Sequence, residues 1–365
     1  MPNDLPPIFF YIPQKEMPEG NIPQSPEDYW HWITTRRGIP RFWGMYNWTL
    51  QTYLYLKDRG FPCEFTCQMP DEGIVLSHRD SLSDDLRPNS RRLLVCVLGD
   101  KEQPRDKGLH PFAQLHVVQN PRDPRLVTNE FAYVPFWPQP GLIPRSPSRG
   151  DRFENIAFYG YEVNLAPELR SPTWASLVQS LGLNWFVVPS DRFHDYEQTD
   201  AMVAVRSFGA TTSYLYKPAT KLHNAWRANV PAVLGVESAY RSERQNELDF
   251  IEVASLDDLV AALVRLRDDV PFRQRIVANG ATRAIGVQSD RVVGAWIDFL
   301  TDVATPAYER WLSGGPGRRI FFVLEGAVQR RALILKATVR RIFKAILRVQ
   351  FYQRLLRSLG RHFLR

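Results

Sequence analysis

The sequence predicts an α/β protein with two Rossmann-like domains that face each other across a cleft, followed by a basic amphipathic helical tail. Three observations lead to this prediction. Short apolar segments alternate with helical patterns in both halves of the chain, as in repeated β-α-β units. A proline-rich stretch separates the two halves, and 365 residues are enough for two domains. The excess of positive charge lies at the carboxyl terminus.

Composition narrows the classes of protein to which the chain can belong. Hydrophobic residues make up 44% and charged residues 23%, which excludes a mostly disordered chain. The three cysteines are too few and too scattered for a disulfide framework, and the first residues do not have the pattern of a secretory signal. No apolar segment approaches the roughly 18 residues that cross a bilayer. We therefore expect a cytoplasmic protein without a membrane span.

The stretch over residues 135–152 marks the domain boundary. It carries five prolines and two glycines, so it cannot form a regular element. We expect an amino-terminal Rossmann-like domain over residues 1–145, a second one over residues 150–304, and the tail over residues 305–365.

In the first domain, short apolar runs bounded by turn residues predict strands of a parallel sheet that is buried on both faces. These runs are residues 7–12, 73–76, 93–98 and 115–118. Asn47 is a suitable cap for a helix from Trp48 to about Arg59, and Gly60 is a suitable stop.

In the second domain the alternation of strand and helix is clearer. Strands are expected at residues 155–159, 185–188, 202–205, 231–234 and 250–253. Helices are expected at residues 172–181, 221–228, 271–282 and 291–300, with another that begins at Ser255. Leu259, Leu263 and Leu266 follow that serine at helical spacing, so the cap and the periodicity agree.

The segment from Arg206 to Tyr240 holds the most informative residues. A strand ends near Arg206, and a loop leads to Lys217 and to a helix start at which Thr220 could be the cap. Ligands of open α/β sheets bind at the carboxyl ends of strands, and the free amides of a first helical turn attract phosphate. Lys217 and Lys221 oppose the helix dipole unless an anion binds there. The alternative is that both lysines are simply solvated.

The run KPATKLHNAWRANVPAVLG, followed by ESAYR, resembles the donor-binding domain of the GT-B glycosyltransferases. In that family a Lys-Leu pair on a helix, an Asn-Ala-Trp-like face and a Gly-Val-Pro-Ala-Val-Leu-Gly strand precede the sugar contacts. Asn229 stands here in place of that first glycine, and asparagine also tolerates a left-handed helix end. The resemblance in sequence covers residues 155–300. The first half of the chain resembles the family only in its expected architecture.

The resemblance implies that the second domain binds a nucleoside diphosphate sugar and that the first domain holds the acceptor. Lys217, Thr220 and Lys221 would hold the donor diphosphate, with Asn224 on the same helix, and Arg206 could add a bidentate contact. Glu237, Ser238 and Tyr240 would contact hydroxyl groups of the donor sugar or ribose. The cations would stabilise the negative charge that develops on the leaving diphosphate.

Two of these residues have plainer alternatives. Arg206 could instead be an exposed partner of Asp200 or Glu197. Glu237 could be an acidic residue that favours the start of a helix.

The sequence gives no sign of a metal site. No two aspartates stand two positions apart, so the Asp-x-Asp motif of metal-dependent glycosyltransferases is absent. The histidines show no close pairing, and Cys63 and Cys67 lack the second pair of a zinc site. We expect a metal-independent reaction without a cofactor, in which protein cations neutralise the phosphates.

A catalytic base for an inverting reaction would come from the first domain. His78 follows an expected strand, titrates in a useful range, and has Asp80 close enough to orient it. Asp71, Glu72 and His116 are weaker candidates. His116 lies inside an apolar strand, which favours a place in the core. The alternative for His78 is a loop histidine without a role.

The tail is strongly basic. Residues 318–365 hold 13 Lys and Arg but one acid, Glu325, whereas the rest of the chain holds 33 basic and 38 acidic residues. Apolar and basic side chains from residue 335 to 349 fall on opposite helical faces, which is typical of helices that lie on anionic membranes. We expect residues 318–365 to dock the protein peripherally on an anionic membrane surface. Packing of the tail on the body is the alternative, and the acidic body argues against a nucleic acid partner.

The function expected from these residues is transfer of a sugar to a glycan or lipid-linked acceptor. One alternative is a nucleotide-sugar epimerase of the same fold, for which a membrane-docking tail has no evident use. Another is a protein that binds a nucleotide sugar and does no chemistry.

Overall fold

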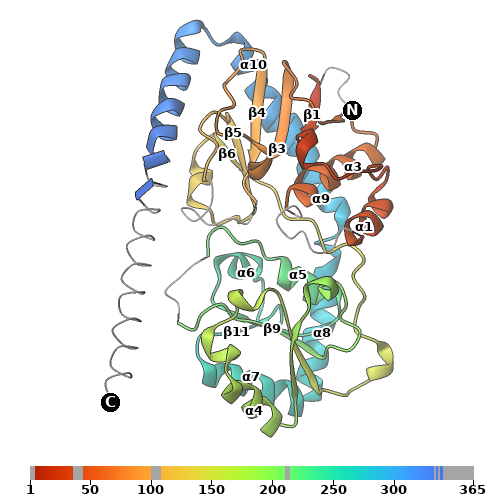
Figure 1. The fold of residues 1–365 in the computed structure, drawn as a ribbon. Helices are drawn as coiled ribbons and strands as arrows, with labels where there is room; N and C mark the ends of the chain where they lie inside the picture. The colour runs from red at the N-terminus through yellow and green to blue at the C-terminus, as the bar shows by residue number, and fades with distance from the viewer. Residues whose placement is uncertain are drawn as a thin grey trace, which may run out of the picture.

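We describe a computed structural model of the chain, for residues 5–35, 44–99, 108–209, 214–332, 334–335 and 338–339. It contains two α/β domains, each built on a parallel sheet, as the sequence predicts (Figure 1). The first domain lies above the second in Figure 1.

The first sheet has the order β2-β1-β3-β4-β5-β6, and every pair is parallel. Its strands are β1 (Ile8–Tyr11), β2 (Glu64–Thr66), β3 (Gly73–His78), β4 (Arg92–Val97), β5 (Leu115–Val118) and β6 (Phe131–Tyr133). β3, β4 and β5 are buried along their whole length, in agreement with their apolar runs. β2 and β6 were not expected, because each is a three-residue edge strand that is only partly buried.

Helices α1 (Pro26–Thr34) and α3 (Gln51–Asp58) belong to this domain. Ser25 caps α1 through a hydrogen bond from the Asp28 amide. The expected start of the second helix at Asn47 is wrong, because helical turns begin before it and a π-helical turn, Tyr46–Leu50, continues directly into α3. Asn47 instead accepts a hydrogen bond from the Tyr29 hydroxyl.

The second sheet has the order β11-β10-β9-β7-β8, again all parallel. Its strands are β7 (Asn155–Tyr159), β8 (Asn184–Val188), β9 (Ala201–Ala204), β10 (Ala232–Gly235) and β11 (Ile251–Val253). Its helices are α4 (Pro172–Ser180), α5 (Thr220–Arg227), α6 (Ser238–Glu243), α7 (Leu256–Asp268) and α8 (Val270–Ile285). Ser255 caps α7 in a capping box with Asp258, as its sequence predicts.

After α8 the chain returns to the first domain. Helix α9 (Ser289–Asp298), a π-helical turn (Phe299–Ala304) and α10 (Thr305–Ser313) follow one another without a break. Trp296, Phe299 and Trp311 share a hydrophobic core with Ile74 and Val95 of the first sheet. The expected boundary at residue 304 is therefore replaced by a boundary near residue 288, and residues 289–313 complete the first domain.

A further helix over residues 316–332 packs on the first domain. Phe322 contacts Trp311 edge to face at 5.3 Å, and a Cβ on Gly326 would lie 2.5 Å from the Pro111 carbonyl oxygen, so the helix backbone approaches the body closely. Arg330 forms an ion pair with Asp85. The first part of the tail therefore packs on the body, which was the alternative to membrane docking; most of residues 333–365, including the expected amphipathic stretch, lies outside the described residues.

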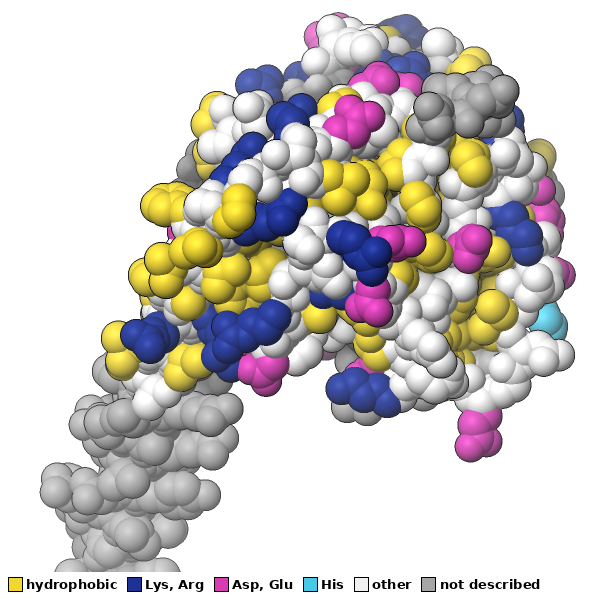
Figure 2. All heavy atoms as spheres, turned by 90° about the horizontal axis from the view of Figure 1, so that it is seen from above, with side chains coloured by type: hydrophobic (Ala, Val, Ile, Leu, Met, Phe, Trp, Pro, Cys, Tyr) yellow, Lys and Arg dark blue, Asp and Glu magenta, His cyan; other side chains and the backbone are white. Residues whose placement is uncertain are grey.

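The outer face of this helix is apolar. Ile320, Phe321, Leu324 and Val328 are each at least 60% exposed. Figure 2 shows apolar and basic side chains interspersed on the side of the first domain that carries the helix. Among the described residues, no helix is both long enough and apolar enough to span a bilayer.

Candidate active site

Both sheets have the same doubly wound strand order, which fixes where a ligand can bind. The order reverses between β1 and β3 in the first sheet and between β7 and β9 in the second. Ligands of such sheets bind outside the carboxyl ends of the strands at this reversal. His78 is the last residue of β3, and Arg206 comes two residues after β9. The sequence analysis expected both residues at carboxyl ends of strands, and the structure has them there, next to the two reversals.

At the reversal point of the second sheet, the expected cations gather around one carboxylate. Arg206 Nε lies 3.0 Å from Glu237 Oε1 in a largely buried ion pair. Lys221 and Lys217 also act electrostatically on Glu237. Asp200 was one alternative partner of Arg206. The Asp200 carboxylate is instead paired with Arg145 and Arg149.

A glycine makes room for one of these lysines. A Cβ on Gly160, just after β7, would lie 3.3 Å from Lys221 Nζ and 2.8 Å from the Phe158 ring. Lys221 Nζ also stands 5.7 Å from the centre of that ring. The lysine side chain thus reaches back from α5 to the end of β7, beside the strand-order reversal.

Burial opposes the charge of Glu237. Desolvation raises the pKa of this carboxyl group above its ordinary value, although Arg206, Lys221 and Lys217 all act to lower it. A buried carboxylate whose neighbours are cations is a suitable acceptor for ligand hydroxyl groups, and its cations are suitable partners for a ligand anion. Glu237 is the N-cap residue of α6, as the helix-start alternative expects, although its side chain makes no cap hydrogen bond.

The start of α5 differs from the prediction. Ala219, and not Thr220, occupies the N-cap position, and no side chain caps the helix. Thr220 Oγ1 is buried and has no hydrogen-bond partner among the described residues. The first turn of α5 therefore presents backbone amides and a threonine hydroxyl next to Lys217 and Lys221, which suits an anion.

Asn120 was not expected from the sequence, yet it joins the two domains at this site. It lies in the turn after β5 and is fully buried. Its Nδ2 donates to Ser238 Oγ at 2.9 Å, to the Lys217 carbonyl oxygen at 3.1 Å and to the Tyr214 carbonyl oxygen at 3.3 Å. The first domain thereby holds the segment that carries Lys217 and the start of α6.

The remaining donor-site candidates have structural partners. Ser238 is bound to Asn120. Asn224 accepts a hydrogen bond from the Gln139 amide in the interdomain stretch and is itself buried. Tyr240 is buried against Phe250 with ring centres 6.3 Å apart. The structure thus places Asn224 and Tyr240 in packing contacts, while residues 211–213 of the loop before Lys217 are outside the described part of the chain.

His78 and Asp80 lie together at the carboxyl edge of the first sheet. The Asp80 amide donates to His78 Nδ1 at 3.3 Å, and Asp80 Oδ2 lies 3.8 Å from the same nitrogen. Because Nδ1 accepts the amide proton, the neutral imidazole carries its own proton on Nε2. The ring is buried, and a Cβ on Gly99 would lie 2.7 Å from Nε2, so this glycine leaves the imidazole its space.

A groove of about 420 Å³ begins at Asp80. Its walls come from the ends of β1 and β3 and the segment after them, with Tyr11, Met69 and Leu82 beside Asp84 and Asp85. β3 and β5 are separated by two strand spacings, about 10 Å, and the register places His78 level with Val117, three residues before Asn120. The groove and the Asn120 turn, which contacts the second domain, therefore both lie at the carboxyl edge of the first sheet.

The other sequence candidates lie elsewhere. His116 is buried in β5, and its pKa is lowered to about 3, chiefly by desolvation, which agrees with a core residue. Within the described residues no group of three or more His, Cys, Asp or Glu side chains gathers as metal ligands do.

Comparison with known proteins gives structural similarities only. No protein-family model and no curated protein sequence matches the chain. HepE from Anabaena in complex with UDP is 11% identical, with a TM-score of 0.49 over 81% of this chain and 100% of that one. Sucrose-phosphate synthase from Thermosynechococcus elongatus is 11% identical, with a TM-score of 0.43 over 70% and 77%.

TarM from S. aureus is also 11% identical, with a TM-score of 0.44, and the match spans 69% of this chain but only 58% of TarM. The fold class itself is established by the two parallel sheets and their shared strand order.

Proposed function

We propose that the protein is a glycosyltransferase that moves a sugar from a nucleoside diphosphate donor to a glycan or lipid-linked acceptor. The observation that carries this proposal is the cation cluster of Arg206, Lys217 and Lys221 around Glu237, at the strand-order reversal of the second sheet. The sequence resemblance to GT-B donor domains supports the same assignment.

The residues of the cluster suit the two ends of such a donor. The cations and the first amides of α5 are matched to a diphosphate, and Thr220 Oγ1 can donate to one of its oxygens. Glu237 can accept hydroxyl hydrogen bonds from the sugar or the ribose. Positive groups that are fixed before the reaction stabilise the charge on the departing diphosphate without reorganisation. We propose that this step needs no metal ion.

The acceptor would bind in the groove that begins at Asp80. We propose that Asp80, which lines the groove, takes the acceptor proton, and that His78, whose buried ring has its Nδ1 3.8 Å from Asp80 Oδ2, supports this carboxylate. A general base must approach the acceptor hydroxyl directly or through one water molecule. Asp80 lines the groove, so its carboxylate is the nearer of the two groups to an acceptor.

A thermal-shift screen with uridine, guanosine and cytidine diphosphate sugars tests donor binding, because a ligand of the folded state raises the melting temperature. Lys221→Ala should abolish the shift and the release of nucleoside diphosphate, with the unliganded melting temperature unchanged. Lys57→Ala, an exposed lysine of α3, is the control and should keep both. A shift without any turnover would favour a binding protein, and turnover that leaves the sugar on its nucleotide would favour an epimerase.

We also propose that the tail associates with an anionic membrane surface, at the cytoplasmic side. The exposed apolar face of helix 316–332 and the basic residues around it support this association. In a flotation assay, the full chain should float with anionic vesicles, whereas a chain truncated after residue 313 should not. Leu324→Glu combined with Val328→Glu in the full chain should weaken flotation in the same way, and unchanged flotation of both variants would exclude the proposal.

A further inference from the structure

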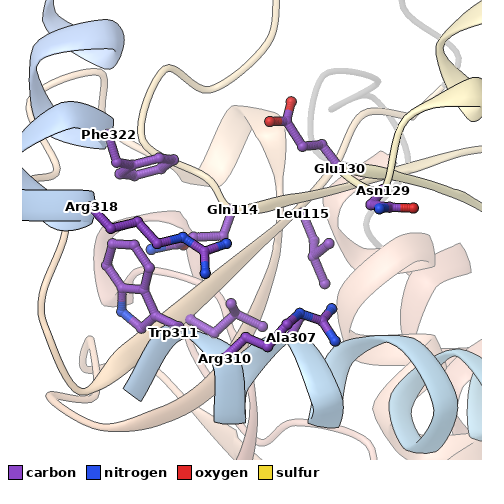
Figure 3. Close-up of a pocket in the computed structure, with 10 residues that line it drawn as sticks. Gln114, Leu115, Asn129, Glu130, Ala307, Arg310, Trp311, Arg318 and Phe322 are labelled. Atoms are coloured by element: carbon purple, nitrogen blue, oxygen red, sulfur yellow. The ribbon is translucent and has the colours of Figure 1, made fainter. Parts of the chain in front are cut away.

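A second cavity lies at the opposite edge of the first sheet from the candidate active site. It has a volume of about 650 Å³ and is lined by the amino-terminal ends of β4 and β5, by α10 and by helix 316–332 (Figure 3). The strands are up to six residues long, so about 20 Å separate this cavity from the carboxyl edge. Its size falls in the range of small-molecule sites.

One wall of the cavity is apolar. Leu93 and Leu115 come from the two strands, and Trp311 and Phe322 come from the two helices. The rings of Trp311 and Phe322 pack edge to face at 5.3 Å. Phe322, one of these four residues, therefore lines the cavity only while helix 316–332 is packed on the body.

The polar groups of the cavity are mostly hydrogen-bond donors. Arg310 of α10 and Arg318 of helix 316–332 both line it, and neither forms an ion pair with any residue that the structure describes. Figure 3 shows the Arg318 side chain extending from its helix toward Gln114. Gln114 accepts the Leu94 amide at 2.8 Å, which fixes its side chain, while its Nε2 is buried and has no partner among the described residues.

One carboxylate is also present. Glu130 lies at the rim, is exposed to solvent, and points away from the two guanidinium groups in Figure 3. The cavity therefore offers two guanidinium groups of exposed arginines and a buried amide donor beside an apolar wall. This combination suits a ligand with a phosphate at one end and hydrocarbon at the other.

We propose that this cavity binds an anionic phospholipid, with the phosphate between Arg310 and Arg318 and the start of an acyl chain against Trp311 and Phe322. The proposal rests on the membrane association proposed above. Arg318 and Phe321 are three residues apart, so they are neighbours on the helix surface. Phe321 belongs to the exposed apolar face, which places the cavity mouth next to the surface that would meet the bilayer. Membrane docking would thus combine an unspecific apolar face with one specific lipid site.

The test uses the full chain and a short-chain phosphatidylglycerol, dihexanoylphosphatidylglycerol, below its micelle concentration, so that no bilayer is needed. We expect saturable binding by calorimetry, weakened at least tenfold in the double variant Arg310→Gln/Arg318→Gln. The matched control Arg170→Gln/Arg291→Gln removes two exposed arginines elsewhere and should change affinity by less than twofold. Equal affinities of the wild type and the Arg310→Gln/Arg318→Gln variant would overturn the proposal.

Binding measurements with other compounds identify the class of ligand. Inorganic phosphate and glycerol phosphate should bind at least tenfold more weakly than the short-chain lipid, and dihexanoylphosphatidylcholine should also bind weakly. If phosphate or glycerol phosphate binds as well as the lipid, the site recognises soluble anions and the proposal fails. If the neutral lipid binds as well, the arginines are not the reason for binding and it fails too.

A second variant leaves both arginines in the sequence but removes helix 316–332 from the cavity, and with it Phe322 and Arg318. Gly326→Leu places a side chain where the Pro111 carbonyl oxygen and the Phe112 ring lie within 2.6 Å of a Cβ, so it should detach helix 316–332 and abolish lipid binding. Lipid binding that survives this detachment would contradict the proposal. The thermal shift with the nucleotide sugar, measured in every variant, should remain, so failure of the lipid site is distinguishable from failure of the donor site.

Discussion

Arg206 and Glu237 form a buried ion pair, with Arg206 Nε 3.0 Å from Glu237 Oε1, at the point where the strand order of the second sheet reverses. The ion pair holds the Arg206 side chain in place. It also neutralises, with Glu237, the positive charge that a donor diphosphate would need. A ligand anion and Glu237 thus compete for Arg206, and a ligand hydroxyl gives Glu237 a new partner.

Glu237→Gln should separate diphosphate binding from transfer. Without the carboxylate, UDP should bind about tenfold more tightly, since one charge-assisted interaction is worth about 1.5 kcal/mol or more. The transfer rate should fall about 100-fold because the hydroxyl acceptor is weakened. Calorimetry with UDP and a turnover assay measure the two effects. Glu252→Gln, which removes the exposed ion pair with Arg241, is the control; weaker UDP binding by Glu237→Gln would contradict the competition.

Asn120→Ala should raise the KM for the donor about tenfold. The variant removes the three hydrogen bonds that join the turn after β5 to the donor-site loop, an effect of about 1–3 kcal/mol. Steady-state kinetics measure this change, and limited proteolysis reports whether the loop has loosened. Asn129→Ala, at an exposed position, is the control. A donor KM within twofold of the wild type would show that the interdomain bonds do not position the loop.

Gly99→Ala should lower both stability and the transfer rate. The residue has a φ of +64°, and a Cβ would lie 2.7 Å from His78 Nε2, so the imidazole must move. Gly60→Ala is the matched control, because φ there is +69° and no atom lies within 4 Å of the new Cβ. Both variants should lose about 1 kcal/mol or more from backbone strain, but only Gly99→Ala should lose transfer activity, about tenfold or more. Equal activity of the two would remove His78 from the mechanism.

His116→Phe should make the protein less sensitive to acid. Burial lowers the pKa of His116 to about 3, whereas an unfolded histidine titrates near 6.5. The unfolded state therefore binds a proton first as the pH falls, and the stability from this residue, complete above about pH 6.5, is lost progressively below it. The loss is about 2 kcal/mol at pH 5. Urea unfolding at pH 7.5 and pH 5 should show a smaller difference in the variant, and His31→Phe, at an exposed position, should leave the difference unchanged.

The features that depend on local pattern were predictable from the sequence. β3, β4 and β5 are buried on both faces, so their apolar runs identified them. The gathering of Arg206, Lys221 and Glu237 was predictable as well, because it follows from the rule that the carboxyl ends of parallel strands meet at one edge. Short edge strands such as β2 and β6 carry no such pattern.

The features that depend on tertiary contacts were not predictable. The periodicity of α9 and α10 shows that each has an apolar face but not which domain that face packs against. Asn120 is an ordinary turn residue in the sequence, and only the approach of the second domain gives it three partners. Thr220 has the chemistry of a helix cap, yet the helix begins at that residue and not after it.

The return of the chain to its first domain affects the order in which the protein can fold during synthesis. The core of the first domain lacks Trp296, Phe299, Tyr308 and Trp311 until the ribosome has made more than four-fifths of the chain. The core of the second domain is complete once residue 285 has emerged. Domains usually fold in the order in which they are translated. Here the second domain can become native on the ribosome first. The first domain must wait for α9 and α10, because until then its central strands lack the aromatic side chains that pack on them.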